Sequence, residues 1–344
     1  MKMVIYDGAN TIGGSKIHVE EGDNGLFLDF GMNFAKYSLY YEEFISERTA
    51  RGIYDLWHLN LIPKLNIYRR DLIPRDLVNE VPRYPKVPAN AVLISHAHLD
   101  HVGNVALLDE NIPVVGSPTT IAILKALNDT SSGGSHFGME IPYYKVKKNK
   151  DEEGYILEAD RNSHYPSRKV ILSEDISSFH DFLFKFIKEA KNASVLITEG
   201  TRVGREEHEN VSEQEVYENA LKIVEEAKGF VIADFSARNF ERLESFKEIA
   251  EKMGRELIVT AKDAYFLHAL KIVDGVDRLK GLRIYGNFKA SRQKWEELVV
   301  WSNYAEYYIS PFEIRENQEN YILCFSFYDM PHLLDIMPNG GTYI

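Results

Sequence analysis

The C-terminal half of the chain alternates short apolar runs with amphipathic segments of helical length, and this pattern constrains the fold most. Parallel strands need a long crossover between them, so the alternation is typical of a parallel sheet covered by helices on both faces. We predict strands at 194–198, 230–234, 256–260, 282–285, 305–309 and 321–327, with helices at 212–228, 239–253, 263–273, 289–301 and 331–336. The capping box Ser212-x-x-Glu215 marks the start of the first helix. We therefore predict a doubly wound α/β domain over residues 200–335.

The N-terminal part follows a different pattern, and we assign residues 1–199 to a separate domain. With 344 residues, 44% of them hydrophobic, the chain can bury the core of two domains. Apolar and polar residues alternate at 15–20 and 25–30 around a glycine-containing turn, which predicts a hairpin. Apolar residues at helical spacing predict a single helix over 37–60, and prolines between 63 and 88 mark a long irregular connection. A short apolar run at 91–95 predicts a strand, and 101–109 a helix.

Between this strand and helix lies His96-Ala97-His98-Leu99-Asp100-His101, the most specific chemical signal in the chain. Imidazole nitrogens and carboxylate oxygens are ligands of zinc and related divalent ions. In an extended loop His96 and His98 point the same way and can share one ion, while Asp100 and His101 can face a second. The alternative is a group of surface histidines with Asp100 as an ordinary N-cap. Packing gives no reason to concentrate these side chains, so the sequence predicts a metal site.

Charge and cysteine content narrow the class of protein. The formal net charge of −12 argues against broad, non-specific nucleic-acid binding, although it permits a local basic groove. The single cysteine, Cys324, lies in an apolar run and excludes an internal disulfide framework; we expect a buried strand residue. No signal-peptide pattern or membrane-length apolar run is present, so we expect a cytoplasmic protein without a membrane partner.

The motifs also resemble a known family. Leu28-Asp29-Phe30-Gly31, the opening Asn10–Gly14 and the loop at 94–103 resemble the metallo-β-lactamase superfamily. Segments 196–202 and 234–239 resemble its β-CASP branch, which contains ribonuclease J-like enzymes and the endonuclease of mRNA 3′-end processing. The resemblance covers most of the chain. It implies a metallo-β-lactamase αββα-type unit joined to a β-CASP-like α/β domain, and a zinc-dependent ribonuclease that cleaves phosphodiester bonds with metal-activated water.

The resemblance assigns roles to the candidate catalytic residues Asp100, Glu199 and Asp29. His96 and His98 would bind one zinc, and Asp100 and His101 would bind a second or act beside it. Asp29 would orient the loop, or would simply be a polar residue that ends a strand. Glu199 would face the active site, or would be an exposed residue at a strand end. Two zinc ions are implied, with one or none as the alternatives.

RNA is the partner that the resemblance implies, and the expected contact is the turn formed by Ser236, Arg238, Asn239 and Arg242. Here a predicted strand ends and a helix begins, so free backbone N–H groups and the helix dipole favour an anion such as a phosphate. The alternative is a capped helix with solvated arginines.

Two expected features of the family are missing or displaced. A further metal-binding His and a bridging Asp are not evident between residues 141 and 199, and Asp175 is the best substitute for the Asp. Residues 336–344 resemble the start of the return into the first domain, which would leave the metallo-β-lactamase unit incomplete at the C-terminus. A homodimer or a partner protein would then cover that side. Two alternatives to a nuclease follow: a non-catalytic RNA-binding or assembly protein of the same fold, and a small-molecule metallohydrolase.

Overall fold

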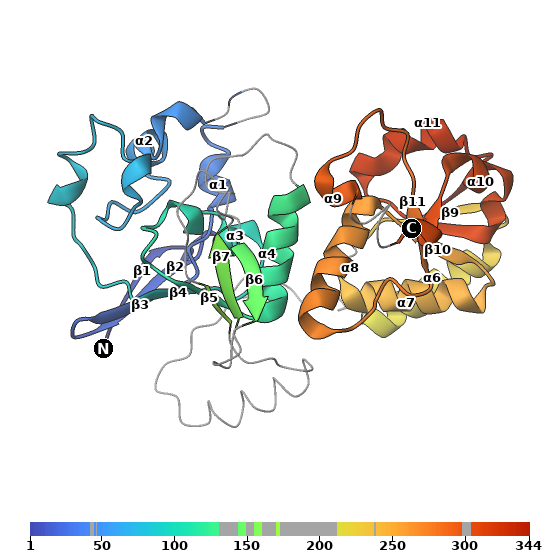
Figure 1. Cartoon of the computed structure of the whole chain (residues 1–344), viewed down its shortest axis with the longest axis horizontal. Helices are drawn as coiled ribbons and strands as arrows, with labels where there is room; N and C mark the ends of the chain where they lie inside the picture. Colours follow the sequence, from blue (N-terminus) through green and yellow to red (C-terminus); the bar gives the residue numbers. More distant parts are fainter. Residues whose placement is uncertain are drawn as a thin grey trace. The chain divides into compact units, whose positions relative to one another are not determined.

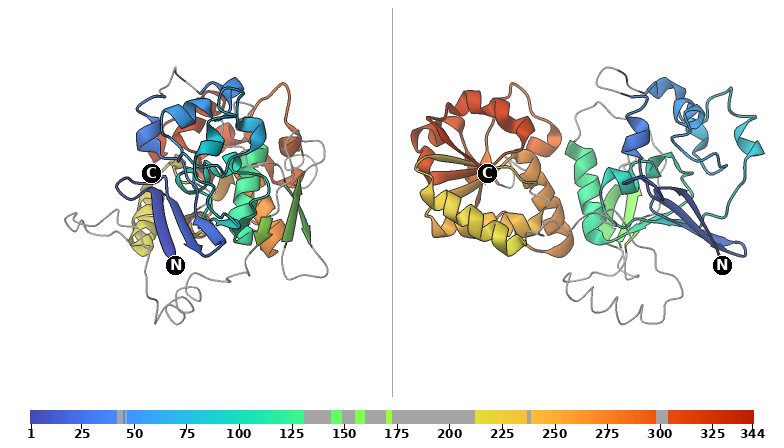
Figure 2. Two further views of the ribbon diagram at one scale, coloured as in Figure 1. Left: turned by 90° about the vertical axis from the view of Figure 1, so that its left-hand side faces the viewer. Right: turned by 180° about the vertical axis from the view of Figure 1, so that it is seen from behind.

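The chain divides by its internal contacts into two units, Met1–Val203 and Gly204–Ile344 (Figure 1; Figure 2 shows two further views). The computed structural model describes residues 1–41, 45, 47–130, 144–148, 155–159, 170–172, 212–236, 239–297 and 304–344. The predicted domain boundary after residue 199 falls outside the described residues and stays a prediction.

The first unit contains a six-stranded sheet of order β1-β2-β3-β4-β5-β8. Its strands are β1 (Lys2–Asp7), β2 (Lys16–Glu21), β3 (Asn24–Leu28), β4 (Ala91–Leu93), β5 (Val114–Gly116) and β8 (Val170–Leu172). The predicted hairpin is confirmed, since β2 and β3 pair antiparallel with His18 opposite Phe27. From β3 onward the strands run parallel. A separate antiparallel pair joins β6 (Tyr144–Lys148) to β7 (Tyr155–Ala159).

The helices of the first unit are shorter than predicted. They are α1 (Phe34–Tyr37), α2 (Tyr54–His58), α3 (Leu99–Val102) and α4 (Pro118–Thr130). The single helix predicted within 37–60 is wrong: before α2 the chain turns at Gly52, whose φ of +55° and contact with the Leu72 carbonyl exclude a continuous helix. The helix predicted at 101–109 is also wrong. The observed helix, α3, ends at Val102. It is followed by Asn104, whose side chain donates to Gly31 O at 3.1 Å, and then by the 3₁₀ turn Val105–Leu107.

The second unit contains a parallel six-stranded sheet of order β12-β11-β10-β13-β9-β14. The strands are β9 (Phe230–Ala233), β10 (Glu256–Val259), β11 (Leu282–Tyr285), β12 (Tyr308–Ile309), β13 (Tyr321–Cys324) and β14 (Gly341–Tyr343). The helices are α6 (Glu213–Glu226), α7 (Phe240–Lys252), α8 (Ala261–Asp274), α9 (Lys294–Glu296), α10 (Pro311–Glu316) and α11 (Leu333–Ile336).

Both faces of this sheet are buried, which confirms the predicted α/β class. Alternate residues of β9 enter different core clusters: Val231 and Ala233 pack with α6, α7 and α8, whereas Phe230 and Ile232 pack with Ile314 of α10 and Ile336 of α11. Figure 1 shows α6, α7 and α8 on one side of the sheet and α10 and α11 on the other. Helix α10 was not predicted, although Ser310 and Glu313 form a capping box at its start.

The C-terminal segment joins this second sheet. Strand β14 pairs parallel with β9, with Thr342 beside Val231, and the Ile344 N–H donates to Ile232 O at 2.9 Å. Residues 336–344, which we expected to begin the return to the first domain, thus supply a strand to the second unit. Cys324 is buried in β13, as predicted. Across the described residues, the helices are too short or too polar to cross a membrane.

Candidate metal centre

The histidine loop begins where two neighbouring parallel strands end. Leu28 of β3 lies beside Leu93 of β4, and the Asp29 N–H donates to Leu93 O at 2.8 Å. Asp29 and Ser95 therefore project from the same edge of the sheet, just before the loop turns into α3. The sheet register, and not proximity in sequence, places Asp29 beside the histidines.

Asp29 holds the loop through both carboxylate oxygens. Oδ1 accepts from the Ser95 N–H at 2.8 Å, and Oδ2 accepts from Ser95 Oγ at 2.8 Å. His101 Nδ1 also lies 2.8 Å from Oδ2. The carboxylate is nearly buried, and Asp29 has a φ of +58°, a conformation rare for residues other than glycine and tolerated best by Asp and Asn. A carboxylate that orients a metal-binding imidazole makes the same contact.

The spacing of the donor atoms fits two pairs of metal ligands. His96 Nε2 lies 3.0 Å from His98 Nδ1, and His101 Nε2 lies 3.5 Å from Asp100 Oδ2. Ligand bonds of about 2.1 Å at tetrahedral angles place two ligand atoms of one zinc about 3.4 Å apart. Each pair can therefore share an ion with little movement.

The four side chains do not complete a metal site by themselves. Within the part of the chain that the structure describes, no group of three or more His, Cys, Asp or Glu side chains is arranged to hold one ion. Further ligands would have to come from other residues or from water. The predicted residues Asp175 and Glu199 lie outside the described residues.

Asp100 does not cap the helix, because His98 is the N-cap of α3 and Asp100 is its second residue. The N-cap alternative is therefore wrong. Asp100 is instead held by glycines: the Gly14 N–H donates to Asp100 O at 2.9 Å, and a Cβ on Gly31 would lie 1.6 Å from that same oxygen. A Cβ on Gly13 would lie 2.5 Å from Asp100 Cβ. The motif glycines are thus required for close backbone approach, a role that their place in the sequence did not predict.

The pKa values of His96 and His101 shift in opposite directions. Burial, and then the neighbouring His101 and His98, lower the pKa of His96. The hydrogen bond to Asp29 raises the pKa of His101. A neutral His96 is ready to bind a cation at neutral pH, and a His101 proton kept on Nδ1 by Asp29 leaves Nε2 for the metal side.

The predicted RNA-contact turn in the second unit has a different environment. Asn239 caps α7, since its Oδ1 accepts from the Arg242 N–H at 3.1 Å. The Arg242 guanidinium donates to both carboxylate oxygens of Glu213, each at 2.9 Å. Ser236 lies between β9 and this cap, where its carbonyl accepts from the Asn239 N–H at 2.7 Å. Arg238 lies outside the described residues.

Comparison with known proteins agrees with this geometry. Residues 82–164, which include the whole histidine loop, match the family model of the metallo-beta-lactamase superfamily. This match supports the resemblance to the superfamily that the sequence motifs predict. The similarity of the chain to several ribonuclease J proteins, at 23–25% identity, supports the predicted resemblance to the β-CASP branch.

Two of the relatives illustrate that similarity. Ribonuclease J of Pyrococcus abyssi is 25% identical over 288 residues, covering 74% of this chain and 58% of the relative. Ribonuclease J of Methanocaldococcus jannaschii is 23% identical over 316 residues, covering 83% of this chain and 66% of the relative. The chain thus spans less than two thirds of either relative.

The fold of this chain is also found in a solved structure. A protein of unknown function from Enterococcus faecalis V583 superposes with a TM-score of 0.60 at 22% identity, covering 95% of this chain and 77% of that one. At this identity the likeness establishes the fold alone.

Proposed function

We propose that the chain is a metal-dependent phosphodiesterase that cleaves RNA at the histidine loop. The observation that carries the proposal is the pairing of four donor side chains, His96 with His98 and Asp100 with His101, in front of a buried carboxylate. Structural packing does not require this arrangement, whereas a metal centre does.

Each residue then has a distinct part. His96 and His98 would hold one ion, and Asp100 and His101 a second, with zinc as the expected metal. Metal ions bound there supply an activated water and charge stabilisation for the leaving oxygen. Asp29 keeps the His101 ring oriented through Nδ1, and the glycine contacts keep Asp100 in place. Asp175 and Glu199 stay predicted contributors, as a bridging ligand and an active-site acid.

RNA is the proposed substrate because the relatives bear the name ribonuclease J. The turn after β9 would contact its phosphates through the backbone N–H groups at the start of α7, with Ser236, Asn239 and Arg238 around them. Arg242 already donates to Glu213 through Nε and Nη2, so it would contact a phosphate only through its remaining guanidinium N–H groups.

The test is cleavage of a fluorescently labelled single-stranded RNA by the full chain supplied with Zn²⁺ or Mn²⁺. We expect the His96→Ala/His98→Ala variant to lose more than about 100-fold in rate, since even supporting residues of metal sites contribute about 10- to 100-fold. The matched control is His58→Ala, which removes an exposed histidine of α2 whose ring lies tilted against that of Tyr54. Its rate should equal that of the unaltered chain.

Other outcomes would contradict the proposal. RNA binding without cleavage, retained in the double variant, would indicate a non-catalytic RNA-binding protein. Hydrolysis of a small ester or lactone but not of RNA would indicate a small-molecule hydrolase.

A further inference from the structure

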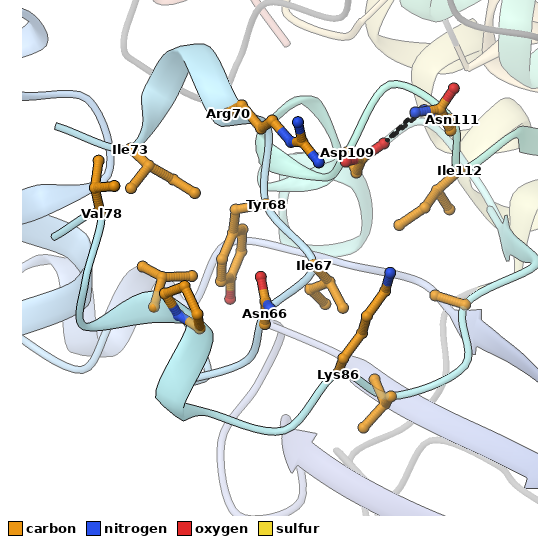
Figure 3. Close-up of a pocket in the computed structure, with 14 residues that line it drawn as sticks. Asn66, Ile67, Tyr68, Arg70, Ile73, Val78, Lys86, Asp109, Asn111 and Ile112 are labelled. Atoms are coloured by element: carbon orange, nitrogen blue, oxygen red, sulfur yellow. Dashed lines mark hydrogen bonds between the residues drawn. The ribbon is translucent and has the colours of Figure 1, made fainter. Parts of the chain in front are cut away.

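A pocket of about 650 Å³ lies in the first unit, built by segments other than the histidine loop (Figure 3). Its walls come from the irregular connection before β4 and from the turn that follows the 3₁₀ segment Val105–Leu107. Its lining residues are Asn66, Ile67, Tyr68, Arg70, Ile73, Val78, Val81, Pro82, Lys86, Val87, Ala89, Asp109, Asn111 and Ile112. Its volume lies within the range of roughly 300–1,000 Å³ that is typical of small-molecule sites.

Backbone hydrogen bonds fix the pocket walls. The Asp109 N–H donates to Ile67 O at 2.8 Å, and the Arg69 N–H donates to Leu107 O at 3.0 Å. The Asn66 N–H donates to Pro85 O at 2.9 Å, which joins two distant parts of the irregular connection. The pocket is therefore part of the packed structure and does not need to be formed by a ligand.

The floor of the pocket is apolar and closed. Ile67, Tyr68, Val81 and Ile112 expose 6% of their surface or less. The Tyr68 hydroxyl donates to Pro63 O, so this buried polar group is satisfied without a ligand. A flat, apolar group entering the pocket would cover these side chains without leaving a buried donor unpaired.

The rim carries an excess of positive charge. Arg70 and Lys86 form no ion pair with any described residue, and in Figure 3 the Lys86 side chain reaches across the pocket towards Ile112. The one acidic lining residue, Asp109, accepts two hydrogen bonds from Asn111 at Oδ1, of 2.9 and 2.8 Å. This excess stands out in a chain with a formal net charge of −12, whose overall field repels anions.

We propose that this pocket binds a small organic anion, with an apolar ring-sized body on the Tyr68 floor and a carboxylate or phosphate at Lys86 and Arg70. The apolar floor would contact the apolar part of the ligand, and the positively charged rim would favour ligands with an anionic group. Asn66 and Asn111 provide amide groups for a polar substituent. The site is separate from the metal centre and does not depend on nuclease activity.

The experiment is a binding titration of the full chain with three naphthalene probes, followed by ligand-observed NMR. 1-Naphthoate and 1-naphthyl phosphate carry the two anionic groups, and 1-naphthalenemethanol is the neutral match. We expect both anions to bind more tightly than the alcohol, and Lys86→Glu to weaken them at least about fivefold, since an exposed charge pair contributes up to about this factor and reversal adds repulsion. Lys64→Glu is the matched control, because it makes the same charge change two residues before Asn66 without lining the pocket.

Two further variants test whether the probes bind in this pocket and whether binding is independent of the metal centre. Ala89→Phe fills the pocket without altering charge and should abolish binding of all three probes in a protein whose circular dichroism is unchanged. His96→Ala/His98→Ala should bind the anions as the unaltered chain does, which separates this pocket from the metal centre. Anion binding that survives both Lys86→Glu and Ala89→Phe, or that disappears in the histidine variant, would overturn the proposal. So would the absence of binding at millimolar probe.

Discussion

At the scale of single residues, Asp29 shows how the site depends on an unusual backbone. Its left-handed φ of +58° turns the carboxylate back onto Ser95 and His101, where it satisfies three donors. Two residues later, Gly31 permits the close approach of the Asp100 carbonyl, because a Cβ at this position would lie 1.6 Å from that oxygen. The positions of His101 and Asp100 are therefore set by the segment that follows β3.

Asp29→Asn should separate orientation from backbone conformation. Asn tolerates the left-handed conformation, but its amide cannot accept from all three donors, so the His101 ring loses its fixed orientation. We expect metal affinity to fall about 10- to 100-fold. The measurement is a metal titration by calorimetry. Asp23→Asn, in the exposed turn between β2 and β3, is the control, and equal affinity in the two variants would contradict the role of Asp29.

Asp263 gives a prediction of pH dependence in the second unit. Burial, with a smaller contribution from Asp329, raises the pKa of Asp263 from its ordinary 3.8 to about 6. The protonated form thus favours the folded state: its contribution to stability is complete below about pH 4 and is lost as the pH rises through 6. We expect Asp263→Asn, which can still accept from Thr260 Oγ1, to gain roughly 2–3 kcal/mol relative to the unaltered chain between pH 4 and pH 7. Urea unfolding at several pH values tests this, and parallel pH profiles would contradict it.

At the scale of elements, the helices of the second unit begin at the carboxyl edge of the parallel sheet or close to it, and their starts are specified locally. Ser212, Ser310 and Ser326 each form a capping box with the residue three positions later. Asn239 and Thr260 cap α7 and α8 with their side chains. Local capping explains why the predicted starts of α6, α7 and α8 lie within two residues of the observed ones, whereas α10 and the segment after Ser326 were not predicted despite their capping boxes.

Removal of one cap should have a small, measurable effect. Ser212→Ala eliminates the acceptor of the Glu215 N–H, at 3.2 Å, and the hydrogen bond that Ser212 Oγ donates to the Glu215 carboxylate, at 2.9 Å. We expect a loss of about 1 kcal/mol in the free energy of unfolding. Ser245→Ala, in the middle of α7, is the matched control and should change stability by less than about 0.5 kcal/mol. Equal losses in the two variants would show that the cap is not the cause.

At the scale of the whole molecule, the features that are specified locally could be predicted and those that depend on tertiary contacts could not. The alternation of short apolar runs with amphipathic segments predicted the parallel sheet of the second unit, and the Ser212–Glu215 capping box predicted the start of its first helix. The failures lie where distant segments decide the backbone: Gly52 turns against Leu72, and Asn104, after α3, bonds to Gly31. Likewise, the pairing of β14 with β9 depends on residues more than a hundred positions apart. At the site, spacing alone identified the histidine loop, whereas the support by Gly13, Gly14 and Ser95 required the fold.

The most direct test for a metal centre at the histidine loop is the metal content of the full chain, purified without chelator and measured by elemental mass spectrometry. Here we predict one to two zinc ions per chain, because the loop offers two ligand pairs, and their loss in the His96→Ala/His98→Ala variant with the fold intact by circular dichroism. The His58→Ala control should retain the full content. A folded, unaltered chain that takes up no zinc or manganese, or a double variant that keeps the same metal content, would contradict the account.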